Sequence, residues 1–319
     1  MTMKKILLSF LALGGLLFAS SCQMDEPDAG TLTGEVDFTI TAGIPGGITT
    51  YSPTDGKAFS HLGGINNVSG DYVLRFILEV YDGNAVAYEE TQYLDDLSKP
   101  QVTFNPRLLA KEYDFVFWAD FVEKGDSEEN RGDLYYNTSN GLTTISYKDN
   151  VTATVLTTDL VDAYYANENV NLTQSSQSLQ VNLQRPFGKI RLLATDSPEN
   201  SNAGEQLPKK VKVSFKARTE LPSSFNALSG EVNQGTKEID GYSFDAQKEM
   251  EPVVTGRGDL AGDGNYAYLL GQAYIFGSSS HTSYDMTVTT YSDDALNAQI
   301  GYRELTNIPV SANKLTTVI

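Results

Sequence analysis

The sequence predicts an all-β protein made of two tandem β-sandwiches. Apolar and polar residues alternate with a period of two along most of the chain, a pattern typical of strands with one buried and one wet face. Patterns with the period of a helix are sparse, so the crossover helices of a parallel sheet are missing. The length of 319 residues fits two domains better than one.

The alternating stretches predict the strands in order along the chain. They are residues 36–42, 74–80, 113–121, 179–183, 190–194, 211–217, 284–291 and 315–319. Residues 113–121 place four aromatic side chains on one face, so we expect a central strand there. In the strand of residues 74–80, Arg75 and Glu79 are expected on the face opposite the apolar one.

Two short segments break this pattern. Residues 159–166 are expected to form the best short helix, with Asp159 as a possible N-cap, and residues 105–109 to form one helical turn. The neighbouring tyrosines 135 and 136, and again 164 and 165, would point to opposite sides of an extended backbone, so we expect one of each pair to be exposed.

Composition shifts divide the chain into four parts. Residues 1–21 are interpreted as a signal peptide and residues 22–33 as an acidic tether. The N-terminal sandwich is expected over residues 34–184 and the C-terminal sandwich over residues 185–319, because Pro186 would interrupt a strand ladder. The polar stretch 196–208 is a second candidate boundary.

The N-terminus predicts export and a lipid anchor. A cationic start with Lys4 and Lys5 and an apolar run over residues 6–18 give way to three small residues before Cys22. This ending resembles the lipobox of bacterial lipoproteins, which implies acylation of Cys22. The acidic stretch after Cys22 also resembles the signal that sends lipoproteins of Bacteroidetes to the outer face of the outer membrane. The alternative is a free thiol after an ordinary secretory cleavage site.

Charge and composition exclude several classes of function. The net charge is −18 and the pI is about 4.4, which disfavours nucleic-acid partners. With two His and one Cys, neither a thiol or imidazole triad nor a multi-ligand zinc site is expected. We therefore expect no cofactor, no metal and no enzymatic activity. A carboxylate pair of the glycosidase kind remains open, because its spacing is visible only in three dimensions.

Several segments together with the lipobox carry a family resemblance. They are residues 59–64, 74–82, 113–121, 183–193 and 308–319. The set resembles the fimbrillin-like surface lipoproteins of Bacteroidales, which are related to type V pili, and in particular a branch with no assigned function. The resemblance implies two tandem transthyretin-like Greek-key sandwiches. It also implies possible pilin partners, because polymerising members add a partner's strand after a protease removes their own first strand.

The sequence departs from the polymerising pattern. Between Cys22 and Leu74 there is no Arg, and Lys57 is the only basic residue, so it is the possible processing site. The chain also ends at Ile319 on an apolar strand with no visible extension to donate. Both features favour an anchor, a tip or a stand-alone adhesin over a shaft subunit.

Two copies of one tripeptide are candidate adhesion loops. Each would present opposite charges from a tight turn to a host or bacterial surface ligand; the residues are Arg131, Gly132 and Asp133, and Arg257, Gly258 and Asp259. The alternative is two ordinary turns, since Gly and Asp are common turn residues. The acidic loop 259–265 lacks the spacing of an EF-hand, and Trp118 is expected in the core.

The sequence therefore predicts an outer-membrane surface lipoprotein that acts as a fimbrillin-like anchor or tip or as a stand-alone adhesin. The alternative is a glycan-binding surface lipoprotein of a polysaccharide-uptake system, which would need exposed aromatic residues across one face.

Overall fold

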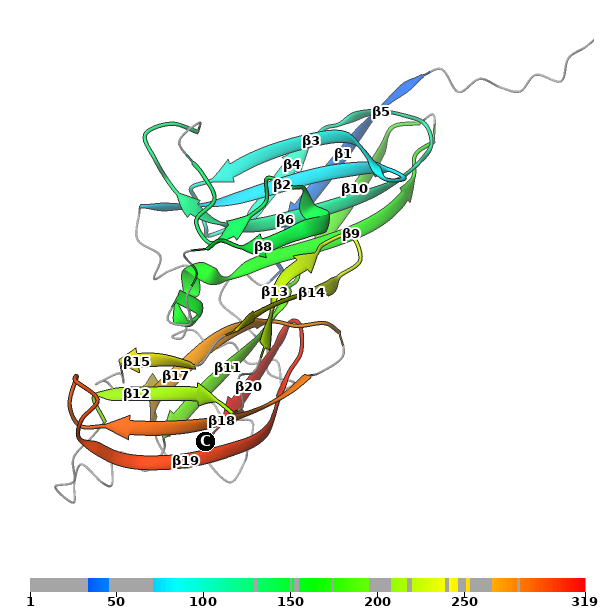
Figure 1. The fold of residues 1–319 in the computed structure, drawn as a ribbon. Helices are drawn as coiled ribbons and strands as arrows, with labels where there is room; N and C mark the ends of the chain where they lie inside the picture. The colour runs from blue at the N-terminus through cyan, green and yellow to red at the C-terminus, as the bar shows by residue number, and fades with distance from the viewer. Residues whose placement is uncertain are drawn as a thin grey trace, which may run out of the picture.

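The structure is a computed structural model, and its architecture confirms the all-β prediction (Figure 1). The structure describes residues 34–45, 71–128, 131–149, 151, 155–173, 175–194, 208–216, 220–238, 241–245, 251–252, 266–279 and 282–318. Within these ranges the chain forms strands and three short 3-10 helices, and no α-helix.

The N-terminal half forms two facing sheets. In the first sheet, β1 lies between β10, to which it is parallel, and the antiparallel strands β4 and β5. The second sheet has the order β3-β2-β6-β9 and is antiparallel throughout. The strands are β1 Glu35–Gly43, β2 Tyr72–Asp82, β3 Ala85–Leu94, β4 Gln101–Phe104, β5 Arg107–Leu109, β6 Glu112–Glu123, β9 Ala163–Asn171 and β10 Gln177–Asn182.

The C-terminal half also forms two sheets. Strand β11 lies between the parallel strand β20 and the antiparallel strand β17, which β16 extends. The second sheet has the order β15-β12-β18-β19. The strands are β11 Phe187–Ala194, β12 Lys210–Phe215, β15 Gly241–Asp245, β16 Glu251–Pro252, β17 Tyr266–Phe276, β18 Thr282–Tyr291, β19 Gln299–Val310 and β20 Lys314–Val318.

The two halves repeat one strand order. In each half the first strand lies parallel to the last one and antiparallel to a middle strand, and the remaining four strands make the facing sheet in corresponding order. The sandwich prediction is confirmed. The predicted boundary between residues 184 and 185 falls between β10 and β11, and independent folding of the two halves stays a prediction.

A fifth sheet joins the two halves. Its order is β14-β13-β8-β7, and β13 pairs with β8 through Ser224 opposite Ser146 and Phe225 opposite Ile145. The strands are β7 Tyr136–Asn137, β8 Ile145–Tyr147, β13 Glu220–Asn226 and β14 Glu231–Glu238. Strands β7 and β8 lie between β6 and β9 in the chain, whereas β13 and β14 lie between β12 and β15. In Figure 1 β13 and β14 lie between the two sandwiches, and β8 lies beside β6 of the upper one.

Two apolar clusters form the core. One fills the N-terminal sandwich and contains the residues expected on a shared face, among them Leu74, Phe76, Phe115, Phe117 and Phe121. The other begins on the opposite face of β2 and β6, passes under the fifth sheet and continues into the C-terminal sandwich. The predicted central strand 113–121 is confirmed, because β6 lies between β2 and β9.

Aromatic rings connect the N-terminal and C-terminal portions of the second cluster. Trp118 of β6 is fully buried, as predicted, and its ring centroid lies 5.3 Å from that of Tyr136 and 6.4 Å from that of Phe225. Phe276 of β17 lies 5.8 Å from Phe225 and 4.6 Å from Phe187. Ring contacts therefore run from one sandwich to the other.

Three local predictions are wrong. Residues 159–166 form a 3-10 turn, Asp159–Val161, and then strand β9, because the backbone from residue 163 onward pairs with β6. Residues 107–109 form β5, a strand rather than a helical turn. Tyr164 and Tyr165 are both buried, because β9 is covered on both faces.

Truncating the ring at the contact between the halves should destabilise the whole chain. Phe225→Ala removes the ring packed on Phe276 and on Tyr165, at 5.8 and 4.6 Å, so we expect a loss of about 3–5 kcal/mol in the free energy of unfolding. Urea denaturation measures it. The exposed Tyr302→Ala is the control and should change stability by about 0.5 kcal/mol or less. Equal effects of the two changes would contradict a packed junction.

Candidate functional site

The first candidate adhesion loop lies against the outer face of β2 and β6. The Asp133 carboxylate accepts hydrogen bonds from the Thr138 amide at 3.1 Å and the Thr138 hydroxyl at 3.0 Å. It also lies 2.8 Å from the Arg75 guanidinium. The Asp133 side chain is only 19% exposed. This carboxylate is therefore bound within the chain.

Arg131, the positive group of the same loop, is also held by its own chain. Its Nε donates to the Lys124 carbonyl at 2.8 Å, and its guanidinium lies over the Tyr93 ring at 4.8 Å. The side chain is 12% exposed and lies 3.9 Å from Glu128. A ligand that engaged both Arg131 and Asp133 would have to replace these contacts. The geometry favours the alternative of a structural turn.

A buried ion pair lies beneath this loop. Arg75 of β2 donates to both carboxylate oxygens of Asp120 on β6, at 2.9 and 2.7 Å. Burial raises the pKa of Asp120, and Arg75 opposes that rise. For Arg75, burial alone would lower the pKa, but the charges of Asp120 and Asp133 raise it. The guanidinium therefore stays charged and joins both carboxylates.

A second buried carboxylate fixes the turn before β8. Glu79 accepts a hydrogen bond from the Leu142 amide at 2.9 Å and another from the Tyr81 hydroxyl. Burial and this bond raise the pKa of Tyr81. Gly141, with a φ of 85°, allows the chain to turn directly above the carboxylate.

Arg75 and Glu79 lie on the face of β2 opposite the apolar one, as predicted, but the expectation that such a face is wet is wrong here. Both side chains are buried under the segment that carries β7 and β8. Their partners were not foreseen either. Asp120, a carboxylate between Trp118 and Phe121 in the predicted central strand, is the available signal, since a charge buried in a sheet needs a partner.

The junction between the two halves carries a third buried network. Arg185 donates from Nε to both oxygens of Asp162 at 2.8 Å and from Nη2 to the Tyr164 hydroxyl at 2.8 Å. Gln184 and Tyr165 exchange two backbone hydrogen bonds of 2.8 and 2.9 Å. The connection between β10 and β11 is therefore tied to β9.

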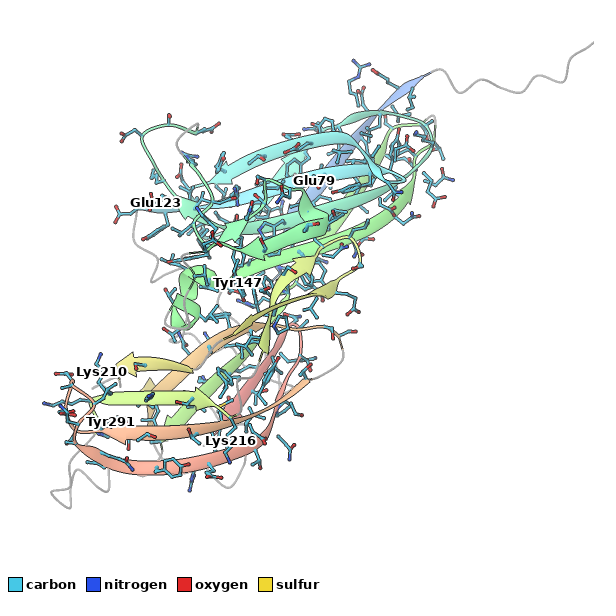
Figure 2. All side chains as sticks on the ribbon, viewed as in Figure 1. Glu79, Glu123, Tyr147, Lys210, Lys216 and Tyr291 are labelled. Atoms are coloured by element: carbon cyan, nitrogen blue, oxygen red, sulfur yellow. The ribbon has the colours of Figure 1, made fainter. Side chains whose placement is uncertain are left out.

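Two surface hollows are lined by polar residues. One, of about 360 Å³, is lined by Asp71, Tyr72, Glu123, Lys124, Gly125 and Asp126. The other, of about 650 Å³, is lined by Asp133, Asn137, Ser146, Tyr147, Lys148 and Asp149. Figure 2 labels one residue of each lining, Glu123 of the first and Tyr147 of the second.

Two further findings, on metal binding and on membrane-spanning helices, apply only to the described part of the chain. Among the residues that the structure describes, no group of three or more His, Cys, Asp or Glu is placed to hold a metal ion. Across the same residues, no helix is both long and apolar enough to cross a membrane.

Several predicted site residues lie outside the described residues. They are Cys22, Lys57, Arg257, Gly258 and Asp259. The signal peptide, the acidic tether, the acidic loop 259–265 and both histidines also lie wholly or almost wholly outside them. Their roles stay predictions.

The fold and contacts define a tandem β-sandwich protein whose halves share one topology and one connecting sheet. The chain belongs to DUF6562, a family of unknown function whose profile matches residues 30–319. No functionally curated protein is detectably similar to it in sequence.

Solved structures similar to the chain include fimbrial proteins of Bacteroidales, as the resemblance in sequence predicts. The C-terminally truncated tip fimbrial protein Mfa3 of Porphyromonas gingivalis has a TM-score of 0.45 and 12% identity, over 85% of this chain and 81% of that chain. A fimbrial assembly protein of Parabacteroides distasonis has a TM-score of 0.40 and 13% identity, over 86% of each chain. These are general likenesses of fold.

Neutralising the carboxylate of the first loop should cost stability. Asp133→Asn removes the charge that Arg75 faces and weakens the bonds from Thr138, so we expect a loss of about 1–3 kcal/mol in the free energy of unfolding by urea denaturation. The exposed Asp126→Asn is the matched control and should be nearly neutral. A stability unchanged by Asp133→Asn would mean that this carboxylate is available to a ligand.

Proposed function

We propose that the chain is a non-enzymatic surface lipoprotein of the outer membrane. It is held by lipid at Cys22 and acts as a fimbrillin-like anchor or pilus tip, or as a stand-alone adhesin. The observation that carries this proposal is the position of β1, which fills the middle of its sheet and completes the core of the N-terminal sandwich.

Strand β1 is bound on both edges. Residues 38–43 pair with β10, residues 40–43 with β4 and residues 35–37 with β5. The side chains of Phe38, Ile40 and Ala42 are buried. Loss of β1 would expose the backbone edges of its neighbours together with this part of the core, and each buried backbone group left unpaired is costly.

This geometry favours a chain that keeps its first strand. With β1 in place, the N-terminal sandwich needs no strand from another subunit, as suits an anchor, a tip or a free adhesin. Cleavage at Lys57 would separate β1 from β2 in the chain, since residue 57 lies between them in sequence. A pilin partner could then add a strand in the vacated position.

Lipid attachment at Cys22 would account for retention of the chain at the membrane surface. Each buried CH₂ of an acyl chain contributes about 0.8 kcal/mol, so two or more chains hold a protein stably. The acidic residues that follow Cys22 would then serve as a solvated tether. The partners of this protein would be outer-membrane lipid, and pilin subunits or surface ligands of a host or another bacterium.

Intact-mass and N-terminal analysis of the protein from its native outer membrane tests the proposal, with gels run before and after boiling. We expect a blocked, lipidated Cys22 on a monomer band. Cys22→Ser should release the protein from the membrane fraction, because the acylated thiol is lost.

Lys57→Gln is the matched variant for processing, and it should leave the mass and the gel pattern unchanged apart from the substitution itself. The proposal fails in favour of a polymerising pilin if the native protein has a free N-terminus just after Lys57 and runs as a heat-sensitive ladder that Lys57→Gln abolishes. Protection of the intact protein from protease added to whole cells would contradict the surface location.

A further inference from the structure

The first and last strands of each half lie side by side and run in the same direction. Residues 38–43 of β1 pair with residues 177–182 of β10, and residues 188–192 of β11 pair with residues 314–318 of β20. Figure 1 shows that β1 begins at the end of the N-terminal sandwich farthest from the C-terminal one and runs toward the junction, from which β11 and β20 run away. All four strands therefore point the same way along the molecule.

This arrangement determines how the chain responds to tension between its N-terminal end and its C-terminal half. Such a pull draws the start of β1 one way and the end of β10 the opposite way, along the direction of the strands. The hydrogen bonds of a ladder run across from one strand to the next. A pull along two parallel neighbours therefore loads all of these bonds together, whereas a pull across a strand pair breaks them one after another.

Strand β1 is also held along its other edge and by its side chains. Residues 40–43 pair with β4 and residues 35–37 with β5, and between these two ladders the Phe38 amide donates to the Pro106 carbonyl at 3.1 Å. The Ile40 side chain is fully buried in the core of the N-terminal sandwich. Sliding β1 out of its sheet therefore breaks a ladder on each edge and exposes apolar area at the same time.

The end of β10 is fastened before the chain enters the second half. The Leu183 amide donates to the Gly43 carbonyl at 2.9 Å, which continues the ladder between β1 and β10. Two residues further on, Arg185 donates to both oxygens of Asp162, which directly precedes β9, and both side chains of this ion pair are buried. Tension that arrives from residue 186 is therefore shared between β10 and the start of β9.

The pair of β11 and β20 is fastened toward both of its ends. The Asn313 amide donates to the Phe187 carbonyl at 2.8 Å where the two strands begin. Toward the other end, Arg191 donates to the Thr317 hydroxyl at 3.2 Å. Strand β11 is also paired with β17 along its other edge. The C-terminal half therefore contains a second parallel pair that follows the first along the line of pull.

We propose that the fold is built to carry tension, with β1–β10 and β11–β20 acting as two clamps in series that are loaded in shear. The load itself rests on the proposed function, because tension arises only when lipid holds Cys22 at the membrane while a ligand or another subunit holds the C-terminal half. The first clamp gives way by sliding of β1, which removes the middle strand of its sheet. The clamps belong to the fold, so their strength is measurable without a membrane.

Single-molecule force spectroscopy on the chain from residue 22 onward, with Cys22→Ser, tests the inference. Handles on the two ends pull the clamps in shear. The comparison has handles at Asn84→Cys and Glu112→Cys, two exposed sites. These sites lie at the same end of β2 and β6, because Tyr81 pairs with Asp114, so this pull peels strands apart. We expect the end-to-end pull to need about twice the force or more, since its hydrogen bonds share the load.

Two substitutions separate the clamp from overall stability. Ile40→Ala on β1 and Leu78→Ala on β2 each remove a fully buried aliphatic side chain, so both should lower the urea midpoint by a similar amount. In end-to-end pulling only Ile40→Ala should lower the rupture force, because β2 is still in place when β1 starts to slide. Equal lowering of the rupture force by Leu78→Ala would overturn the proposal, since the force would then report overall stability.

A disulfide across the first clamp provides an independent test. Thr39 of β1 and Ser178 of β10 are exposed and directly opposite each other, so Thr39→Cys combined with Ser178→Cys places two thiols within bonding reach. Oxidation shields residues 40–177 from the pull, so it should remove about 480 Å from the extension released, at about 3.5 Å per residue. Reduction should restore that extension.

The matched control disulfide joins Thr289→Cys to Tyr302→Cys, a pair of β18 and β19 outside both clamps. This bond encloses only residues 290–301, so the force at which the first clamp ruptures should not change. The proposal is overturned if end-to-end rupture needs no more force than peeling, or if oxidation of the first clamp leaves the released extension unchanged. Neither result bears on lipid attachment at Cys22, which mass analysis of the native protein decides separately.

Discussion

Burial of the outer face of β2 and β6 is the constraint on which the rest of the architecture depends. In a simple sandwich this face would meet water, yet here it carries Trp118, which is fully buried, together with the Arg75–Asp120 pair. Such a face is stable only if something apolar covers it and every buried charge has a partner. Strands from the N-terminal half, β7 and β8, supply the cover, and β13 of the C-terminal half pairs with β8 to extend it.

The contacts that cover the outer face of β2 and β6 also determine the positions of nearby loops and turns. Asp133 completes the coordination of Arg75, so the candidate adhesion loop becomes part of the cover. Glu79 holds the turn that leads into β8. On the far side, Arg185 binds Asp162 at the connection between the halves. Buried polar groups thus determine where the segments that cross between the sandwiches lie, while aromatic packing provides the apolar area between them.

The alternating pattern predicts β1, β2, β6, β10, β11, β12, β18 and β20 and the apolar face of β6, because burial on one side of a sheet leaves a period of two in the sequence. It does not predict other strands, among them β3, β17 and β19. It could not show that the polar face of β2 is covered, since Arg75 and Glu79 read the same whether they meet water or buried partners. The pairing of β8 with β13 links residues 145–146 to residues 224–225, and nothing local in either segment signals such a distant contact. The short run from Asp159 was mistaken for a helix because its strand partner, β6, is also remote in sequence.

The exposed edge strands limit the ways in which this chain can associate with other chains. The edge strand β3 carries Glu89 and Glu90 beside a bulge in its pairing with β2, and β19 contains Pro309 and two irregularities in its pairing with β18. Charges, bulges and proline all discourage pairing with a foreign strand. Association through these edges is therefore disfavoured, whereas β1 is a central strand whose loss would leave two compatible neighbours, β10 and β4. Assembly by strand addition, if this chain undergoes it, would therefore depend on whether β1 is retained, because the position of β1 offers a foreign strand a neighbour on each side.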